Sequence, residues 1–298
     1  MTAAIALLGA VDGRVLRLAG WRVKGALHLS PYDDLRDVPS YAALEDLLAD
    51  DELDAVALDG TDPLLARHLP TLLGHGLHVL LATAAPLDPE VLRAARRVEG
   101  PAEVAVALLQ RWEPWALTAA AAIPLVGTPV LQATVRGWPR GVAAAAELVD
   151  LARSWCGDVV SVSALPTPLP ATDLGKGLPV AWSLLHGSGA TTLVSHEGAP
   201  PLARLSFAGA RLEVGPLGAR WEGGAEIPLV STPDRRAVAG APAGLLASAA
   251  ALLEAVESSV LATDVWPWPA DLGDLQAISR VLAALRESAR SETPVRVA

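Results

Sequence analysis

The sequence predicts an α/β protein with two domains, of which the first carries a parallel sheet and the second a mainly antiparallel, open sheet. Its 298 residues suffice for two modest domains or one large one. Strand and helix signals alternate over roughly the first hundred residues, and short strands with a period of two residues follow later. We therefore expect the domains to span residues 1–110 and 111–298.

Alternating signals in the first domain predict strands joined by helices, which is the pattern of a doubly wound, Rossmann-like sheet. Two helices begin with an aspartate followed by a proline, which favours a capped first turn. Ser40 is placed to cap a third helix. The expected strands are Ala3–Leu8, Leu53–Leu58, His78–Leu81 and Val104–Leu108, and the expected helices are Tyr41–Ala49, 62–76 and 88–100.

The second domain opens with a predicted helix over Val142–Trp155, closed by Gly157. Several of the segments that follow alternate apolar and polar residues, which predicts an antiparallel sheet with one covered face and one open face. The expected strands are Val159–Ala164, Val180–His186, Thr191–His196, Ala203–Phe207, Arg211–Val214 and Ala219–Glu222. Two closing helices, Ala243–Leu261 and Leu272–Ala289, are expected next, the second capped by Asp271 and packed back toward the first domain.

Composition argues against several classes of function. A net charge of −10 without a basic cluster opposes nucleic-acid binding. The single cysteine, Cys156, excludes an internal disulfide and a multi-thiolate metal site. Mean hydropathy is +0.37, yet the longest apolar stretch, Ala116–Val135, is broken by prolines and a glycine and does not predict a membrane span. Ala3–Val11 lacks the features of a signal peptide, so we expect a cytoplasmic protein.

Five stretches, taken in order, resemble one family of enzymes. They are Tyr41–Leu58, Gly74–Leu81 (GHGLHVLL), Arg111–Pro114 (RWEP), Glu147–Val162 (ELVDLARSWCGDVVSV) and Asp271–Val297. Together they resemble the Gfo/Idh/MocA-type oxidoreductases, the glucose–fructose oxidoreductase and inositol dehydrogenase family, over nearly the whole chain. The resemblance implies a nucleotide-binding domain followed by a substrate and dimerisation domain, with hydride transfer to or from a nicotinamide cofactor.

The dinucleotide fingerprint of that family is only partly present. It needs glycines because the backbone must turn tightly and approach the pyrophosphate. Here Gly9 alone falls in place, and Gly13 offers a glycine in a shifted register. Val11 would put a branched side chain where pyrophosphate sits in the family, and Asp12 would add repulsion. Gly9 and Gly13 are thus the candidate residues of a degenerate cofactor site.

The acid that would hold the cofactor's ribose in the family is also missing. Its position falls near His28 or Leu29, and neither side chain accepts hydrogen bonds as a carboxylate does. We therefore expect no bound cofactor, with NAD(P) as the alternative.

The catalytic residues that the resemblance implies have changed as well. The family's lysine falls at Thr83, and its aspartate and histidine, four residues apart on one helix face, fall at Ala143 and Glu147. The following Asp150 matches the family. Glu147 is the one ionisable group left for acid–base chemistry. It either faces the cleft as a lone carboxylate or pairs at the surface with a neighbouring arginine.

Other residues carry weaker hypotheses. Lys176, in a glycine- and proline-rich loop, is either a replacement ligand for an anionic substrate or a solvated loop lysine. His186 and His196 lie on neighbouring strands, but no third ligand has suitable spacing, so we predict no metal site. Trp266 and Trp268 either line a pocket, anchor a partner or pack against the second domain.

Three functions remain open on the sequence alone. The first is a non-catalytic homologue that acts as a partner or scaffold, which accounts for all the losses together. The second is an enzyme with changed chemistry that uses Glu147 as acid or base. The third is a working NAD(P)-dependent oxidoreductase acting on a sugar-like or other small hydroxyl or carbonyl substrate. We expect the open sheet face to be apolar and to form a homodimer or a heteromer with a homologous protein.

Overall fold

The computed structural model describes residues 3–27, 38–82, 87–138, 141–164, 181–196, 202–216, 218–222, 226–227, 243–258 and 270–297. The chain divides into two compact units. The first comprises Met1–Leu109 and Arg235–Gln276, and the second Gln110–Asp234 and Ala277–Ala298. The predicted fold class is confirmed, because the first sheet is parallel and the second is mainly antiparallel.

The first unit is built on a five-stranded parallel sheet with the strand order β2-β1-β3-β4-β5. Every residue of β1 and β3 is buried, as expected for parallel strands that are covered on both faces. The strands are β1 (Ala4–Leu8), β2 (Arg22–Leu27), β3 (Ala55–Leu58), β4 (His78–Leu81) and β5 (Val104–Val106).

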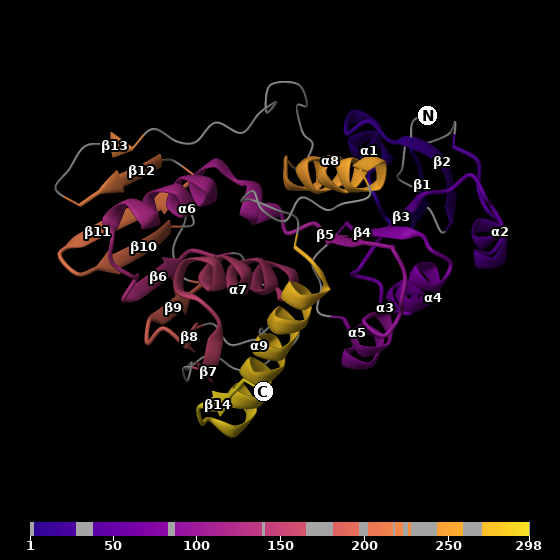
Figure 1. The fold of residues 1–298 in the computed structure, drawn as a ribbon. Helices are drawn as coiled ribbons and strands as arrows, with labels where there is room; N and C mark the ends of the chain where they lie inside the picture. Colours follow the sequence, from indigo (N-terminus) through magenta and orange to yellow (C-terminus); the bar gives the residue numbers. More distant parts are fainter. Residues whose placement is uncertain are drawn as a thin grey trace. The chain divides into compact units, whose positions relative to one another are not determined.

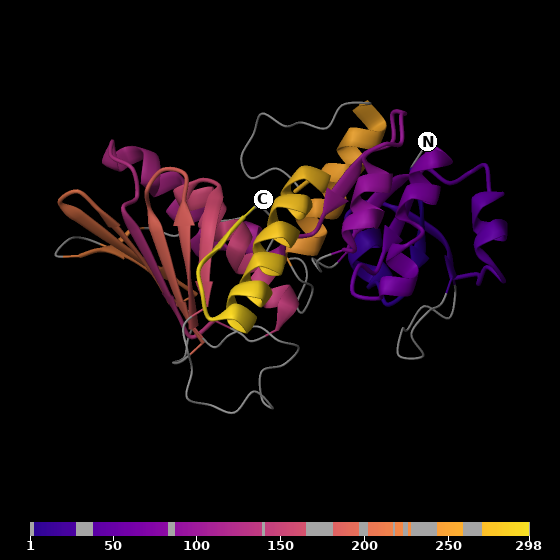
Figure 2. The ribbon, with the colours of Figure 1, turned by 90° about the horizontal axis from the view of Figure 1, so that it is seen from below.

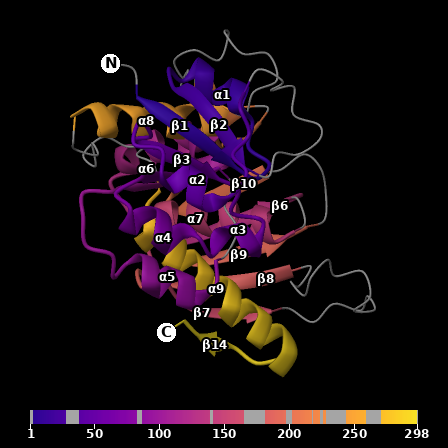
Figure 3. The same cartoon turned by 90° about the vertical axis from the view of Figure 1, so that its right-hand side faces the viewer.

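Helices cover both faces of this sheet. Helices α1 and α8 lie side by side over one face, where Leu7 and Val15 share a core with Leu252, and α3, α4 and α5 lie on the other (Figures 1 and 3). The Trp21 indole N–H donates to the carbonyl of Ala249 at 2.8 Å, which ties α8 to the start of β2. The helices are α1 (Gly13–Leu18), α2 (Leu44–Leu48), α3 (Pro63–Ala66), α4 (Leu69–Gly74), α5 (Pro89–Ala95) and α8 (Ala243–Ser258).

Two helix predictions in the first unit need correction. Ser40 does not cap α2; it forms a parallel bridge with Ala26, and the helix begins after Ala43. The single helix expected over residues 62–76 is two helices, separated at Arg67 and His68. Pro70, in the first turn of α4, has no backbone N–H to continue a ladder of hydrogen bonds from α3.

The second unit is built on a nine-stranded sheet with the order β13-β12-β11-β10-β6-β9-β8-β7-β14, in which only β6 and β9 pair in parallel. Helices α6, α7 and α9 lie on one side of it (Figure 2). The strands are β6 (Gln132–Arg136), β7 (Val159–Ala164), β8 (Ala181–His186), β9 (Thr191–Ser195), β10 (Leu202–Phe207), β11 (Ala210–Gly215), β12 (Gly218–Trp221), β13 (Glu226–Ile227) and β14 (Val295–Arg296). The helices are α6 (Pro114–Val126), α7 (Val142–Cys156) and α9 (Leu272–Ser291), with a short 3₁₀ turn, η1 (Leu109–Trp112), before α6.

Helix α6 and strand β6 were not among the predicted elements. Together with the residues between them, they contain the apolar stretch of residues 116–135. Helix α6 buries Trp115 and four alanines or leucines that follow it. Gly127, at a φ of +68°, ends the helix, and Gln132 starts the strand. No helix in the described part of the chain has the length and apolar character needed to cross a membrane.

Both closing helices form, and Asp271 caps α9 by accepting from the backbone N–H of Asp274 at 2.8 Å. Helix α8 belongs to the first compact unit, and α9 begins in the first unit and continues in the second after Gln276. Docking of the final helix on the first domain stays a prediction.

Candidate functional site

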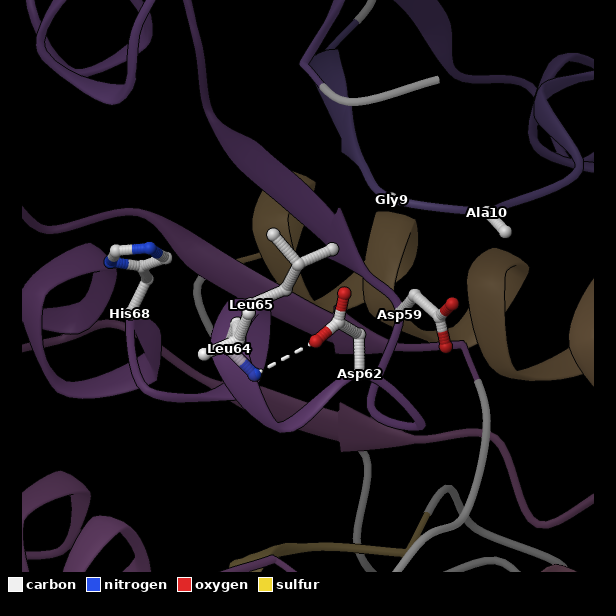
Figure 4. A pocket seen from close by; sticks show the side chains of 7 residues that line it. All are labelled: Gly9, Ala10, Asp59, Asp62, Leu64, Leu65 and His68. Carbon is white, nitrogen blue, oxygen red and sulfur yellow. Dashed lines mark hydrogen bonds between the residues drawn. The ribbon is translucent and has the colours of Figure 1, made fainter. Parts of the chain in front are cut away.

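A pocket of about 410 Å³ opens at the carboxyl ends of β1 and β3. The order of the sheet reverses between these two strands, because β2 and β3 flank β1 on opposite sides. In open α/β sheets, ligands bind at this position. Figure 4 shows the lining residues, which come from the turn after β1, from α3 and from the residues just before and after α3: Gly9, Ala10, Asp59, Asp62, Leu64, Leu65 and His68.

Gly9 allows the two turns to approach each other closely. Its φ is +89°, a conformation that favours glycine. A Cβ atom at this position would lie 2.5 Å from Leu65 Cδ1 and 2.9 Å from Asp59 Cβ. Gly9, the glycine expected for a dinucleotide turn, therefore does adopt a positive φ. The space that a Cβ would take is filled by Leu65 of α3 and by Asp59.

Two carboxyl groups line the pocket and are held by their own turn. Asp59 is 8% exposed and accepts from the backbone N–H and the hydroxyl of Thr61 at 2.9 and 2.7 Å. Asp62 caps α3 by accepting from the N–H of Leu64 at 2.8 Å (Figure 4). No lysine or arginine is among the described lining residues. The pocket thus offers acceptors and negative charge.

Sequence reasoning identified Asp62 only as a helix cap and did not assign Asp59. The signal was present, because Asp59 follows directly on the buried strand β3 and Asp62 comes three residues later. Polar residues at the carboxyl ends of parallel strands gather at one edge of the sheet.

Val11 does not obstruct a pyrophosphate as the sequence suggested. Its side chain is 1% exposed and belongs to the core beneath α1 and α8, so it points away from the pocket. Gly13 is the buried first residue of α1, and its φ is not in the positive range. It therefore does not replace the missing glycine of the fingerprint as a turn residue.

Two backbone N–H groups of the turn after β1 already have acceptors within the protein. Binding of a pyrophosphate would require backbone N–H groups directed at phosphate oxygens. Instead, the N–H of Val11 donates to the carbonyl of Gly9 at 3.0 Å, and that of Arg14 donates to the Asp12 carboxylate at 3.0 Å. The pocket beside the turn is acidic.

A second group of polar residues lies on α7, where the family keeps its acid–base pair. Glu147 is 8% exposed, and its Oε2 accepts from the backbone N–H of Gln110 at 3.0 Å. One hypothesis from the sequence made Glu147 a surface residue paired with a neighbouring arginine, and its burial contradicts a surface position. Arg153, one of the neighbouring arginines, forms an ion pair with Asp158 at 2.9 Å. Ala143, one turn earlier, has no side chain that transfers protons.

Asp150 holds the same 3₁₀ turn from the next part of α7. Its carboxylate takes two hydrogen bonds from the guanidinium of Arg111, one of them at 2.9 Å from Nε. The two side chains are 2% and 4% exposed, respectively. A buried, bidentate pair of this kind fixes the position of η1 against α7.

The two strand histidines do not meet. His186 is 1% exposed; its Nδ1 lies 2.6 Å from the carbonyl of Gly157 and its Nε2 lies 2.8 Å from the Thr192 hydroxyl. Burial lowers the pKa of His186. His196 bonds elsewhere, to the carbonyl of Trp138 at 2.8 Å. Within the described residues, no three His, Cys, Asp or Glu side chains are grouped so as to hold a metal ion.

Several residues singled out from the sequence lie outside the described part of the chain. They are His28, Leu29, Thr83, Lys176, Trp266 and Trp268. Their assigned roles stay predictions.

The chain aligns over its full length with solved oxidoreductase structures. An aldose–aldose oxidoreductase from Caulobacter crescentus, complexed with glycerol, has 16% identity and a TM-score of 0.75 over 99% of this chain and 100% of the other. An oxidoreductase from Agrobacterium radiobacter, in complex with NAD+, L-tartaric acid and magnesium, has 16% identity and a TM-score of 0.71 over 100% and 99%. A candidate myo-inositol dehydrogenase from Sinorhizobium meliloti has 17% identity and a TM-score of 0.69 over 100% of both chains.

These structures define the class of the fold, a two-domain α/β oxidoreductase fold. More specifically, the chain has the Gfo/Idh/MocA-type fold, so the resemblance read from its motifs is confirmed as a shared fold. No protein-family model matches the sequence, and no curated protein matches it significantly.

Proposed function

We propose that this protein is a non-catalytic relative of the Gfo/Idh/MocA-type oxidoreductases that acts as a partner or scaffold. The observation that carries the proposal is the position of Glu147, which stands where the family has its histidine. Its carboxylate is buried and accepts a backbone N–H from the adjoining 3₁₀ turn at 3.0 Å. A general acid or base must reach the proton that it transfers, whereas this group holds the backbone.

The neighbouring positions of α7 support the same interpretation. Ala143 cannot exchange protons, and Asp150 is engaged with Arg111 in the buried ion pair. Of the two positions of the family's acid–base pair, one is thus an alanine and the other, Glu147, holds the backbone of η1. The engaged N–H groups of the turn after β1 are a second, independent support.

An assay of hydride transfer tests the proposal. We expect no turnover of NADH, NADPH or their oxidised forms with sugars, inositols or their keto derivatives. Glu147→Gln, which keeps an acceptor for the Gln110 N–H, serves as the matched variant. Steady turnover by the wild-type protein that Glu147→Gln abolishes would show that Glu147 is catalytic, and the second hypothesis from the sequence would replace the first. Turnover that survives in Glu147→Gln would favour an NAD(P)-dependent oxidoreductase with other catalytic residues.

Two observations favour the oxidoreductase hypothesis: the pocket of about 410 Å³ at the reversal of strand order, and the fold shared with an oxidoreductase solved in complex with NAD+. A titration with NADH that monitors energy transfer from tryptophan tests it before any substrate is known. Saturable transfer would favour this hypothesis, and we expect none.

The partner surface that we propose is the open face of the nine-stranded sheet. The row of residues across the middle of this face is mainly polar, whereas the sequence predicted an apolar face. One row across its middle strands reads Ser183, Leu193, Thr134, Arg204 and Glu213, so polar and charged side chains surround a central leucine.

We propose that this face pairs with a second copy or with a homologous chain around Leu193, which is partly buried in the single chain. Leu193→Arg should convert a dimer measured by light scattering into a monomer, and Leu18→Arg, at a 55% exposed position of α1, is the control. A wild-type monomer at micromolar concentration would exclude self-pairing. Co-purification with a co-expressed homologue would then test the heteromer, and it should be lost in Leu193→Arg.

A further inference from the structure

One carboxylate occupies the groups that would attract a phosphate at the turn between β1 and α1. Asp12 Oδ1 accepts from the backbone N–H of Arg14 at 3.0 Å and from Nε of the same arginine at 3.2 Å. Asp12 Oδ2 accepts from Arg14 Nη2 at 3.3 Å. One backbone N–H of the turn and its cationic side chain are thus both bound by the same internal anion.

Other backbone donors of the turn are also engaged within the protein. The N–H of Gly9 donates to the carbonyl of Leu27 at 3.0 Å, and the N–H of Val11 donates to the carbonyl of Gly9 at the same distance. The N–H of Val15 donates to the carbonyl of Asp12 at 3.1 Å, inside the first turn of α1. A phosphate would therefore have to displace bonds that already exist.

The negative charges around the turn also oppose phosphate binding. Asp59 and Asp62 line the pocket beside the turn, and together with Asp12 they place three carboxyl groups on the two turns at this end of the sheet. A phosphate carries negative charge of its own, so like-charge repulsion opposes its approach.

We propose that Asp12 is a specificity-determining residue that acts as a built-in anion and excludes phosphorylated ligands, dinucleotides included, from this pocket. The inference rests on the proposed function, because it deepens the account of the same nucleotide position. The sequence hypothesis named both a steric obstruction by Val11 and repulsion by Asp12, and only the part that concerns Asp12 is retained. Since the Val11 side chain is in the core, its replacement does not open the site.

Binding of ADP and adenosine to the wild type and to Asp12→Asn tests the proposal, because the two ligands differ only in their phosphates. Asparagine caps helices about as well as aspartate does, so this variant removes the charge and keeps the fold of α1. Asp88→Asn is the matched control, since Asp88 caps α5 in the same way, accepting from the N–H of Glu90 at 2.7 Å.

We expect Asp12→Asn to bind ADP about tenfold or more tightly than the wild type, because a like charge is removed and Arg14 is released toward the phosphates. Its affinity for adenosine should be unchanged, and Asp88→Asn and Val11→Ala should bind ADP as the wild type does. Calorimetry or NMR titration at millimolar ligand measures these affinities.

Two results would overturn the proposal. One is a wild-type protein that binds ADP more than tenfold more tightly than adenosine. The other is an Asp12→Asn variant whose ADP affinity is not raised, including a variant that shows no ADP binding at all. The outcomes separate from those of the proposed function. NADH binding to the wild type without turnover contradicts the role of Asp12 but leaves the absence of catalysis in place. Wild-type turnover together with a gain of ADP affinity in Asp12→Asn contradicts the non-catalytic function and leaves the role of Asp12 in place.

Discussion

Removal of the carboxylate of Asp150 is the sharpest test of how η1 and α7 are held together. In Asp150→Ala the guanidinium of Arg111, whose side chain is 4% exposed, loses a bidentate partner that binds it at 2.9 Å through Nε. Water does not replace that partner easily at this depth. Breaking a buried ion pair costs about 3–5 kcal/mol, because a charge is left buried without its counter-ion.

The control is the exposed ion pair of Arg153 and Asp158 on the same unit. Its distance is 2.9 Å, but the Asp158 side chain is 80% exposed. Asp158→Ala should therefore cost less than about 1 kcal/mol. Urea unfolding followed by tryptophan fluorescence suits the comparison, because six of the nine tryptophans lie in the second unit.

The double variant Arg111→Leu with Asp150→Leu separates loss of a partner from loss of packing. It should be more stable than Asp150→Ala, since no buried charge is left behind. If Asp150→Ala costs no more than Asp158→Ala, the ion pair does not fix η1 to α7, and the structural role that we assign to this helix face is wrong.

Three further predictions concern other parts of the fold. Gly9→Ala should destabilise the first unit by about 1–3 kcal/mol, measured by urea unfolding, and by more than Gly76→Ala; both glycines have positive φ, but only a Cβ at Gly9 would meet Leu65, at 2.5 Å. Because burial lowers the pKa of His186, the unfolded state binds the proton more readily, so stability should fall as pH falls below the ordinary value of 6.5. Unfolding midpoints between pH 7 and 5 measure that slope, and an equal slope in His186→Gln would contradict the assignment. Burial raises the pKa of the Cys156 thiol to about 11, so at pH 8 iodoacetamide should alkylate it only after unfolding, and rapid alkylation of the native protein would refute its burial.

The sequence identified most of the fold because the patterns that carry it are local. Continuous apolar runs such as Ala55–Leu58 are legible as buried parallel strands, and alternation along β10 and β11 predicted an antiparallel pair that the register confirms. Aspartate caps at α3, α5 and α9 were also correct, because a cap is set by two or three neighbouring residues.

Errors arose where distant residues decide the outcome. Helix α6 was missed because its all-round apolar sequence has no helical periodicity, and its burial depends on the strands β11 and β12. Ser40 pairs with Ala26 across the edge of the sheet instead of capping α2, which no local pattern indicates.

Sequence by itself indicated the two-sheet plan and placed Thr83, Ala143 and Glu147 at positions where the family that it resembles has catalytic residues. Only the tertiary structure decided what Val11, Asp12 and Glu147 contact. In the structure, Val11 lies in the core, and Asp12 accepts hydrogen bonds from the N–H and the guanidinium of Arg14. The N–H of Gln110 donates to Glu147. The physical reason is that a side chain's chemistry depends on which donors and charges surround it, and residues 37 positions apart, such as Gln110 and Glu147, become neighbours only when the chain folds.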